Sequence, residues 1–578
     1  MGKGPNEKTF GFSDIYHKKI FSVMSSIYPE QQALEATEEI LNLIRNYGYD
    51  KSMEESFLSE KDVLLITYGD SLKRDNEKPL KTLYNFYIKN LNDAFSFIHI
   101  LPFFPYSSDD GFSVIDYKKV NPELGDWPDV EHFNSHCKLM FDFVLNHISS
   151  KSRWFKRYLN QEKGFADLAI EVDPNEDVSM VFRPRALPLL TPFKKKDGSE
   201  VYVWTTFSSD QIDLNYKSID VLIRMMDVLL FYVKKGASMI RLDAIAYLWK
   251  EIGTSCIHLK QAHLFVKLMR IITEAVKKEC IILTETNVPH KDNILYFGNG
   301  NDEAHMIYNF TLPPVVLYTF LTENTDILNK WAQTLVTPSE KTTFLNFTAS
   351  HDGIGVLPLK EFISESEFNN LIEHIKRNGG YVSYKTDKDK KIPYELNISY
   401  VDAIRSENDT PEKLAKKFVA SQSISVVLPG VPALYIHSIL GSRNFYKGVK
   451  LTGKPRSINR EKLNMDKVAC ELSDKNSFRS RIFYPLKEIL NIRRKHSAFH
   501  PNAEFEILWV HPGVFAIKRF NKKQTIYAFT NVSEKQVDFD LPSNTDKENF
   551  VCILGQNNIN RSKLSLMPYE VCWFSKVY

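Results

Sequence analysis

The segment 239–247, MIRLDAIAY, places two opposite charges inside an apolar stretch that has the composition of a buried strand. Amphipathic helical patterns flank it, as expected for a parallel strand in a sheet covered by helices. Side chains alternate along a strand, so Arg241 and Asp243 point to the same side. Buried charges are costly unless they are paired or lie at a wet strand end. The segment predicts either a structural ion pair or a site at the carboxyl end of a strand.

Other apolar runs also end on polar residues, in order and separated by helix-length spacers. These runs end at Asn146 and His147, at Glu285, and at His351 and Asp352. In a barrel of alternating strands and helices, the carboxyl ends of all strands meet at one rim. The series therefore predicts an α/β fold, a (β/α)8 TIM barrel, with its site at that rim.

Four motifs resemble the sequence regions of a known superfamily. FDFVLNH, RLDAIAY, LTETN and SHDG are similar to the four regions of the α-amylase superfamily (glycoside hydrolase family 13) of retaining glycosidases and transglycosidases. ILPFFPYSSDDGFSVIDY and WTTFSSDQIDLNY resemble its sucrose phosphorylase subfamily. RPRALPLLTPF and TGKPRSINR are most similar to the glucosylglycerate phosphorylase branch. The resemblance covers roughly residues 60 to 500.

The resemblance implies a role for each rim residue. Asp243 would be the nucleophile, Glu285 the acid and base, and Asp352 the group that holds two sugar hydroxyls. The implied glucose contacts are Asp109, Phe112, His147, Phe207, Gln211, Arg241, His351 and Arg456, with Arg456 bridging to Asp109. A guanidinium fork matches phosphate, and the resemblance implies Arg185 of the Arg-Pro-Arg segment as the phosphate ligand, together with Tyr394.

The implied reaction is the reversible phosphorolysis of 2-O-α-D-glucosylglycerate to α-D-glucose 1-phosphate and D-glycerate, by double displacement. The main alternative is a sucrose or sucrose 6'-phosphate phosphorylase. An α-glucoside hydrolase and a non-catalytic amylase-like transport accessory are further alternatives. A glycerate carboxylate needs cationic neighbours, and we expect them from Arg183 and from a lysine-bearing loop at 379–397, which we predict to be mobile over the site.

The rest of the chain predicts three parts. Residues 1–60 have helical periodicity and form an extension that we expect to pack or to contact a second subunit. Residues 61–502 form the barrel, with an inserted subdomain at about 160–215 because the spacer there is too long for one helix. Residues 503–578 carry short alternating runs, which predict an antiparallel β domain.

Composition limits the partners. The 74 basic and 71 acidic residues of the 578-residue chain give a net charge of +3, which favours no nucleic acid and no acidic membrane. Small molecules fit better, namely an α-glucoside, inorganic phosphate and glycerate. The six cysteines lack C-x-x-C spacing, and no secretory signal or membrane span is visible, so we expect a cytoplasmic enzyme. A homodimer is left open.

No cofactor or metal is expected. The sequence has no P-loop and no dinucleotide fingerprint. Many amylase relatives bind calcium, and Asn146 matches one of their ligands, but the subfamily that this chain resembles generally dispenses with the ion.

Overall fold

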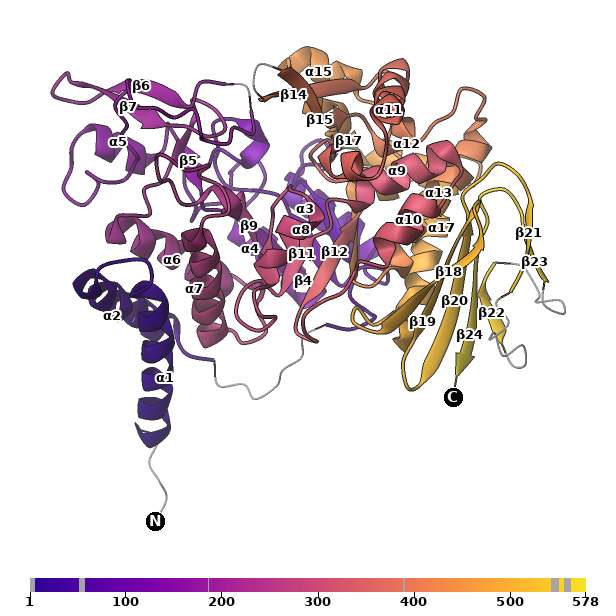
Figure 1. The fold of residues 1–578 in the computed structure, drawn as a ribbon, viewed down its shortest axis with the longest axis horizontal. Coiled ribbons are helices and arrows are strands. Elements are labelled where there is room, and N and C mark those ends of the chain that lie inside the picture. Colours follow the sequence, from indigo (N-terminus) through magenta and orange to yellow (C-terminus); the bar gives the residue numbers. More distant parts are fainter. Residues whose placement is uncertain are drawn as a thin grey trace.

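The centre of the protein is a closed barrel of eight parallel strands (Figure 1). The computed structural model describes residues 6–50, 58–185, 187–387, 390–541, 550–555 and 563–577. The barrel strands are β1 (Leu64–Thr67), β3 (Phe97–Ile100), β4 (Lys138–Val144), β9 (Ala237–Asp243), β10 (Ile281–Thr284), β11 (Met306–Tyr308), β12 (Thr343–Phe347) and β16 (Val431–Tyr435). β16 pairs with β1 and closes the ring. The predicted TIM barrel is confirmed.

Helices pack around the barrel with their apolar faces inward. Helix α6 shows the principle, because its buried residues recur at helical spacing, as in Val221, Leu222, Met225 and Met226. The long helices of this layer are α3 (Pro79–Asn90), α6 (Ile219–Lys234), α7 (Lys260–Val276), α9 (Leu312–Thr322), α13 (Pro411–Val427) and α17 (Phe478–Arg493). These helices leave the carboxyl-terminal rim of the barrel to the loops.

An insert between β4 and α6 stands beside this rim. It contains β5 (His147–Ser149), α5 (Arg153–Leu159), β6 (Leu190–Lys194), β7 (Glu200–Trp204) and β8 (Gln211–Asp213). β5 pairs with β8 in antiparallel register, with His147 opposite Asp213 and Ser149 opposite Gln211. The pairing brings Gln211 to the rim beside His147. An insert was predicted here, and its boundaries stay a prediction.

A β-hairpin lies over the rim from the other side. β14 (Tyr381–Asp387) pairs with β15 (Lys390–Asn397), and β13 (Ile354–Gly355) joins β15 (Figure 1). Ser383 is opposite Glu395 whereas Tyr384 is opposite Pro393, which leaves Tyr394 as an extra residue in a bulge. The segment predicted as a lysine-bearing loop is therefore two paired strands, with residues 388–389 outside the described part.

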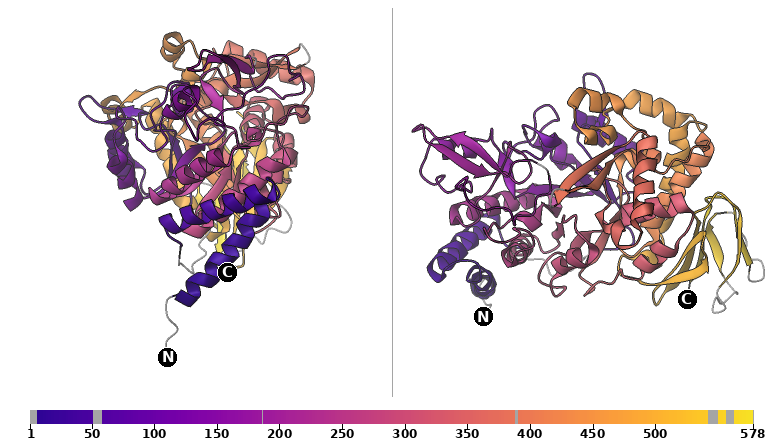
Figure 2. Two further views of the ribbon diagram at one scale, coloured as in Figure 1. Left: turned by 90° about the vertical axis from the view of Figure 1, so that its left-hand side faces the viewer. Right: turned by 45° about the horizontal axis from the view of Figure 1, so that its top comes forward.

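The first two helices form a pair at the edge of the barrel. α1 (Asn6–Met24) packs against α7, and α2 (Glu30–Tyr47) packs against α6 and α7. The Tyr47 hydroxyl donates to the Asp227 carboxylate on α6 at 2.8 Å. Figure 2 shows α1 reaching beyond the body of the molecule. The helices predicted for the extension are present.

The C-terminal part is an antiparallel sheet on the opposite edge (Figure 2). Its strand order is β18 (Glu504–His511), β19 (Val514–Phe520), β20 (Gln524–Asn531), β24 (Val571–Val577) and β22 (Val551–Leu554), and β21 (Val537–Asp540) pairs separately with β23 (Lys563–Leu566). Contacts between β20 and α13 attach this sheet to the barrel. The predicted C-terminal β domain is confirmed, and the boundary at residue 503 stays a prediction.

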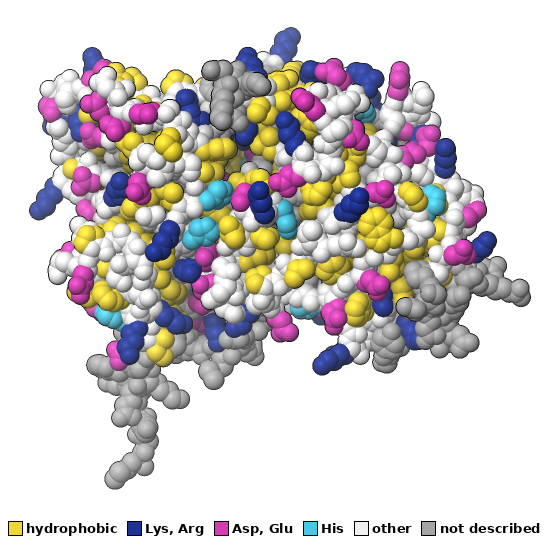
Figure 3. Space-filling view, in the orientation of Figure 1, with side chains coloured by type: hydrophobic (Ala, Val, Ile, Leu, Met, Phe, Trp, Pro, Cys, Tyr) yellow, Lys and Arg dark blue, Asp and Glu magenta, His cyan; other side chains and the backbone are white. Residues whose placement is uncertain are grey.

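Charged side chains of both signs are interspersed over the face in Figure 3. Within the described ranges, no helix is both long enough and apolar enough to cross a membrane.

Candidate active site

One pocket at the carboxyl-terminal rim is lined by all the predicted catalytic, glucose-binding and phosphate-binding residues. These residues are Asp109, Phe112, His147, Arg185, Phe207, Gln211, Arg241, Asp243, Glu285, His351, Asp352, Tyr394 and Arg456. Two groups of side chains form its walls. The "rim half" comes from the strand ends and the loops directly after them, with Asp109, Asp243, Glu285 and Asp352. The "roof half" comes from the insert and the hairpin, with Phe182, Arg185, Lys385 and Tyr394.

Arg241 connects the carboxylates of the rim half. Its Nη1 lies 2.8 Å from Asp243 Oδ1 and 2.5 Å from Asp142 Oδ1, and its Nη2 lies 4.0 Å from Glu285 Oε1. Asp142 is opposite Arg241 in the β4–β9 register and also accepts from His99 Nε2 at 2.6 Å. Arg241 therefore makes the buried ion pairs that MIRLDAIAY allowed, and the role of this strand end as a site stays a prediction.

Sequence reasoning missed Asp142 and His99. Both are fully buried in barrel strands. The signal was the same as for Arg241, a charged residue inside an apolar strand, in FDF of β4.

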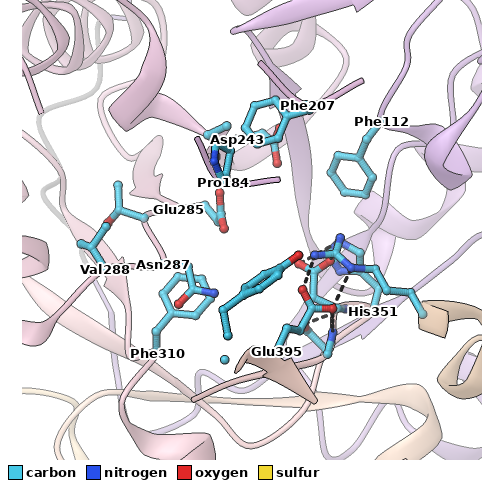
Figure 4. Close-up of a pocket in the computed structure, with 18 of the residues that line it drawn as sticks. Phe112, Pro184, Phe207, Asp243, Glu285, Asn287, Val288, Phe310, His351 and Glu395 are labelled. Atoms are coloured by element: carbon cyan, nitrogen blue, oxygen red, sulfur yellow. Dashed lines mark hydrogen bonds and ion pairs between the residues drawn. The ribbon is translucent and has the colours of Figure 1, made fainter. Parts of the chain in front are cut away.

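Glu285 follows β10 and is held by the backbone after the nucleophile candidate. The N–H of Ala244 donates to Glu285 Oε2 at 3.0 Å. Ala244 has a φ of 52°, a left-handed conformation that costs an alanine about 1 kcal/mol or more. This turn places Asp243 and Glu285 so that both point into the same space (Figure 4).

Burial raises the proton affinity of both carboxyls. Burial raises the pKa of Glu285 to about 7, although Arg241 opposes the shift. Burial also raises the pKa of Asp243 to about 6, and here Arg241 opposes it at shorter range. Arg241 lies closer to Asp243 than to Glu285, so it favours the ionised form of Asp243 more strongly and leaves Glu285 the better holder of a proton. That is the pairing of nucleophile and acid that retaining glycosyl transfer requires.

Asp352 is held by arginines from TGKPRSINR. Arg456 Nη1 lies 2.6 Å from Asp352 Oδ1, and Arg460 Nη2 lies 3.7 Å from the same oxygen. Burial opposes ionisation, but Arg456 together with the other cationic groups nearby holds the pKa of Asp352 well below its usual range. Asp352 is therefore a permanent anion that can accept hydrogen bonds from sugar hydroxyls.

The predicted bridge from Arg456 to Asp109 is wrong. Arg456 forms two parallel contacts with Glu395, from Nε at 2.9 Å and from Nη2 at 2.6 Å. Asp109 instead pairs with Arg185 Nη2 at 3.2 Å. The hairpin brings Glu395 to Arg456, so the guanidinium is already shared by two carboxylates. The sequence gives no sign of which carboxylate lies nearest.

The loop that carries Asp109 is strained and tightly fixed. Asp109 and Asp110 both have positive φ, 55° and 49°. Asp210 of the insert anchors the loop, because its carboxylate accepts from four hydroxyls at 2.5 to 2.8 Å, those of Ser107, Ser108, Ser113 and Ser150. Sequence reasoning missed Asp210, since a Ser-Ser pair in a turn and a distant aspartate give no signal of contact.

Aromatic rings and neutral histidines complete the rim half. The Phe112 ring stacks on the His351 ring with centroids 4.9 Å apart. His147 Nε2 lies 2.9 Å from the Phe112 carbonyl oxygen and 3.1 Å from Gln211 Nε2. Burial lowers the pKa of His147 to about 4 and that of His351 to about 3, so both are neutral near pH 7. They are hydrogen-bonding groups here and add no charge.

The roof half joins two elements that are distant in sequence. Arg185 from the insert donates to the Phe207 carbonyl oxygen at 3.5 Å in addition to its contact with Asp109. Tyr394 from the hairpin bulge lines the same pocket. Arg183, predicted as an acceptor contact, is exposed and donates to the Leu187 carbonyl oxygen outside the pocket lining. That prediction for Arg183 is not supported by its position.

Asn146 contacts an ammonium group. Lys250 Nζ lies 2.6 Å from Asn146 Oδ1 and 2.5 Å from Asp213 Oδ2, and all three side chains are buried. Asn146 matches a calcium ligand of amylase relatives, and the positive charge beside it in this chain is the Lys250 ammonium. Over the described part of the chain, no group of three or more His, Cys, Asp and Glu side chains is arranged to hold a metal. The six cysteines are free thiols.

Comparisons with known proteins agree with this geometry. Residues 86–354 match the α-amylase catalytic domain. A glucosylglycerate phosphorylase of Escherichia coli K12 is 46% identical over 89% of this chain and 92% of its own length. A glucosylglycerate phosphorylase of Spirochaeta thermophila is 44% identical over 96% and 97% of the two chains. The crystal structure of sucrose 6F-phosphate phosphorylase from Thermoanaerobacter thermosaccharolyticum superposes with a TM-score of 0.73 at 25% identity, covering 85% of this chain and 97% of that one.

Proposed function

The chain belongs to the glucosylglycerate phosphorylase family and carries an α-amylase catalytic domain, and from this premise we propose that it catalyses the reversible phosphorolysis of 2-O-α-D-glucosylglycerate. The products are α-D-glucose 1-phosphate and D-glycerate. The observation that carries the proposal is the identity of 44 to 46% with glucosylglycerate phosphorylases over about nine tenths of the chain, against 25% with a sucrose 6F-phosphate phosphorylase.

In the first step, Asp243 attacks the anomeric carbon and forms a glucosyl ester. Glu285 gives its proton to the glycosidic oxygen, so that glycerate leaves as an alcohol. Arg241 supports this step because it holds Asp243 in place at 2.8 Å. Asp352, kept anionic by Arg456, holds the sugar hydroxyls as the ring flattens.

In the second step, phosphate opens the glucosyl ester. It enters the space that glycerate has left and attacks the anomeric carbon from the face opposite Asp243, while Glu285 takes back a proton from phosphate and the ester bond to Asp243 breaks. Two inversions retain the α configuration. Arg185 and Tyr394 are the proposed phosphate ligands, and both line the pocket in the roof half. Arg185 already forms an ion pair with Asp109. Phosphate would therefore either replace Asp109 as the partner of this guanidinium or bind beside it.

The sugar half of the reaction is common to the alternatives, and the acceptor distinguishes them. A sucrose or sucrose 6'-phosphate phosphorylase would use the same Asp243, Glu285 and Asp352 but place fructose or its phosphate in the roof half. A hydrolase would place water there. A non-catalytic accessory would not need the three carboxylates, which here line one pocket with raised pKa values for two of them.

The experiment that tests the proposal follows the donor with and without phosphate. The enzyme is incubated with 2-O-α-D-glucosylglycerate, and glucose 1-phosphate and free glucose are measured separately. We expect phosphate-dependent formation of glucose 1-phosphate and little free glucose. Equal release of free glucose with and without phosphate would make the protein a hydrolase. An intact donor under both conditions, together with turnover of sucrose, would support the rival phosphorylase.

We also propose a cellular location and an oligomeric state for the enzyme. The six free thiols support a reducing compartment and hence the cytoplasm. The pair of α1 and α2 is the proposed contact for a homodimer, supported by the exposed apolar side chains Ile15 and Leu34. Light scattering of the full chain and of a variant with Ile15→Glu and Leu34→Glu checks the second point.

A further inference from the structure

The β14–β15 hairpin presents Lys385 to the pocket. Ser383 and Lys385 are two residues apart on β14, so their side chains lie on the same face of the hairpin. Ser383 is opposite Glu395, which therefore shares that face, and Glu395 lines the pocket and binds Arg456. The strand register thus points Lys385 toward the pocket, and Lys385 is among its lining residues.

Lys385 reaches across to the insert. Its ammonium lies 5.2 Å from the centre of the Phe182 ring, which forms part of the same wall. The Phe182 ring lies 6.3 Å from the ring of Tyr247, and burial together with the charge of Glu285 raises the pKa of Tyr247. A continuous wall therefore runs from the acid candidate Glu285 through Tyr247 and Phe182 to Lys385.

The chemistry of the substrate requires a cation on this side. In a 2-O-glucosylated glycerate the carboxylate is attached to the carbon that carries the glycosidic oxygen. When Glu285 protonates that oxygen, the carboxylate lies only a few bonds away on the leaving-group side. The pocket-lining guanidiniums of Arg241, Arg456 and Arg185 each contact a carboxylate of this chain, namely Asp243, Asp352 and Asp109. A charged group brought out of water needs a charged or hydrogen-bonding partner.

We propose that Lys385 binds the carboxylate of glycerate and so determines the preference of the enzyme for glycerate over uncharged acceptors. This inference rests on the proposed function. Glycerate and glycerol differ only in a carboxylate that replaces a hydroxymethyl group, so a lysine at this position discriminates between them by charge. The cation–π contact with Phe182 orients the ammonium at the pocket wall. The sequence predicted a contact with glycerate from the lysine-bearing segment 379–397, and we assign this contact to Lys385.

The test compares acceptors in the synthetic direction. Phosphate release from α-D-glucose 1-phosphate is measured with D-glycerate and with glycerol for the wild type, Lys385→Met, Lys385→Arg and Lys391→Met. Lys391 is the matched control, because it lies on the same hairpin but is exposed and outside the pocket lining. The rate with glycerol reports whether each variant is folded and can form the glucosyl enzyme.

We expect Lys385→Met to lower kcat/KM for D-glycerate at least about tenfold while the value for glycerol changes less than about threefold. Lys385→Arg should keep most of the preference, and Lys391→Met should resemble the wild type. An unchanged ratio of glycerate to glycerol in Lys385→Met, with wild type still preferring glycerate, overturns the assignment of Lys385 and leaves the proposed function standing. A wild type that does not prefer glycerate overturns the proposed function itself, and the inference with it.

Discussion

The two halves of the pocket are held together differently. In the rim half, carboxylates and guanidiniums interlock, as in the contacts of Arg241 with Asp142 and Asp243 at 2.5 and 2.8 Å. The side chains stand on strands that are buried on both faces. In the roof half, an insert and a hairpin face each other across the pocket, and the Lys385 ammonium lies 5.2 Å from the centre of the Phe182 ring.

The difference suggests a division of labour. A rigid set of charges suits a bond-breaking step that depends on geometry of a few tenths of an ångström. Walls made of loops can change without disturbing the barrel, because loops tolerate substitution better than the strands that support them. On this account the rim half carries the chemistry that relatives with different acceptors share, and the roof half selects the acceptor.

The strongest test of the rim half is removal of its nucleophile. Asp243→Asn should lower transfer at least about a thousandfold with every acceptor, because a neutral amide cannot form the glucosyl ester. Glu285→Gln should recover activity with α-glucosyl fluoride, whose leaving group needs no proton. Turnover of the fluoride by both variants is the measurement. Near-normal turnover by Asp243→Asn would remove the nucleophile from this residue.

A substitution in the roof half should affect one substrate only. Arg185→Ala loses a charge-assisted contact worth about 1.5 to 3 kcal/mol, so the KM for phosphate should rise at least about tenfold. Arg183→Ala is the matched control, since Arg183 is a neighbouring exposed arginine outside the pocket lining. Steady-state phosphorolysis at varied phosphate measures both. An equal rise in the two variants would mean that net charge, and not a phosphate contact, is responsible.

The sequence predicted the rim half far better than the roof half. Asp243, Glu285 and Asp352 stand at strand ends in short motifs, and a strand end fixes the position of its next residue. The contact of Arg456 was predicted wrongly because its partner, Glu395, lies 61 positions away and arrives through the hairpin. Lys385 could not be singled out among the lysines of 379–397, since only the register of β14 with β15 decides which side chain faces the pocket.

The anchor of the Asp109 loop connects the two halves, and weakening it should have a moderate effect. Asp210→Asn replaces one carboxylate oxygen by an amide NH2 group. The hydroxyls of Ser107, Ser108 and Ser113 then have one hydrogen-bond acceptor fewer. We expect the KM for glucose 1-phosphate to rise about threefold to tenfold, equally with each acceptor, because the loop carries a sugar contact. Asp177→Asn, an exposed aspartate in the same insert, is the control. A change in acceptor preference would show that the loop belongs to the roof half.

The smallest effect that we expect is that of pH on the rate of phosphorolysis. This effect distinguishes the roles of Asp243 and Glu285 in the rim half. Below about pH 6 Asp243 gains a proton and loses its nucleophilicity, and above about pH 7 Glu285 loses the proton that the leaving oxygen needs. We therefore expect a bell-shaped rate with its maximum between these values and a fall of about tenfold per pH unit well beyond either of them. With α-glucosyl fluoride the alkaline limb should disappear, since no proton is needed. An alkaline limb that persists with the fluoride would assign it to a group other than Glu285.

The most direct test of the central claim is an acceptor screen in the synthetic direction. Phosphate release from α-D-glucose 1-phosphate is measured with D-glycerate, L-glycerate, glycerol, fructose and fructose 6-phosphate at equal concentrations. We expect the fastest release with D-glycerate and much slower release with glycerol, which lacks the carboxylate. Faster release with either fructose compound than with both glycerates would contradict it. In that case the roof half accepts a sugar, while the assignment of Asp243, Glu285 and Asp352 would be unaffected.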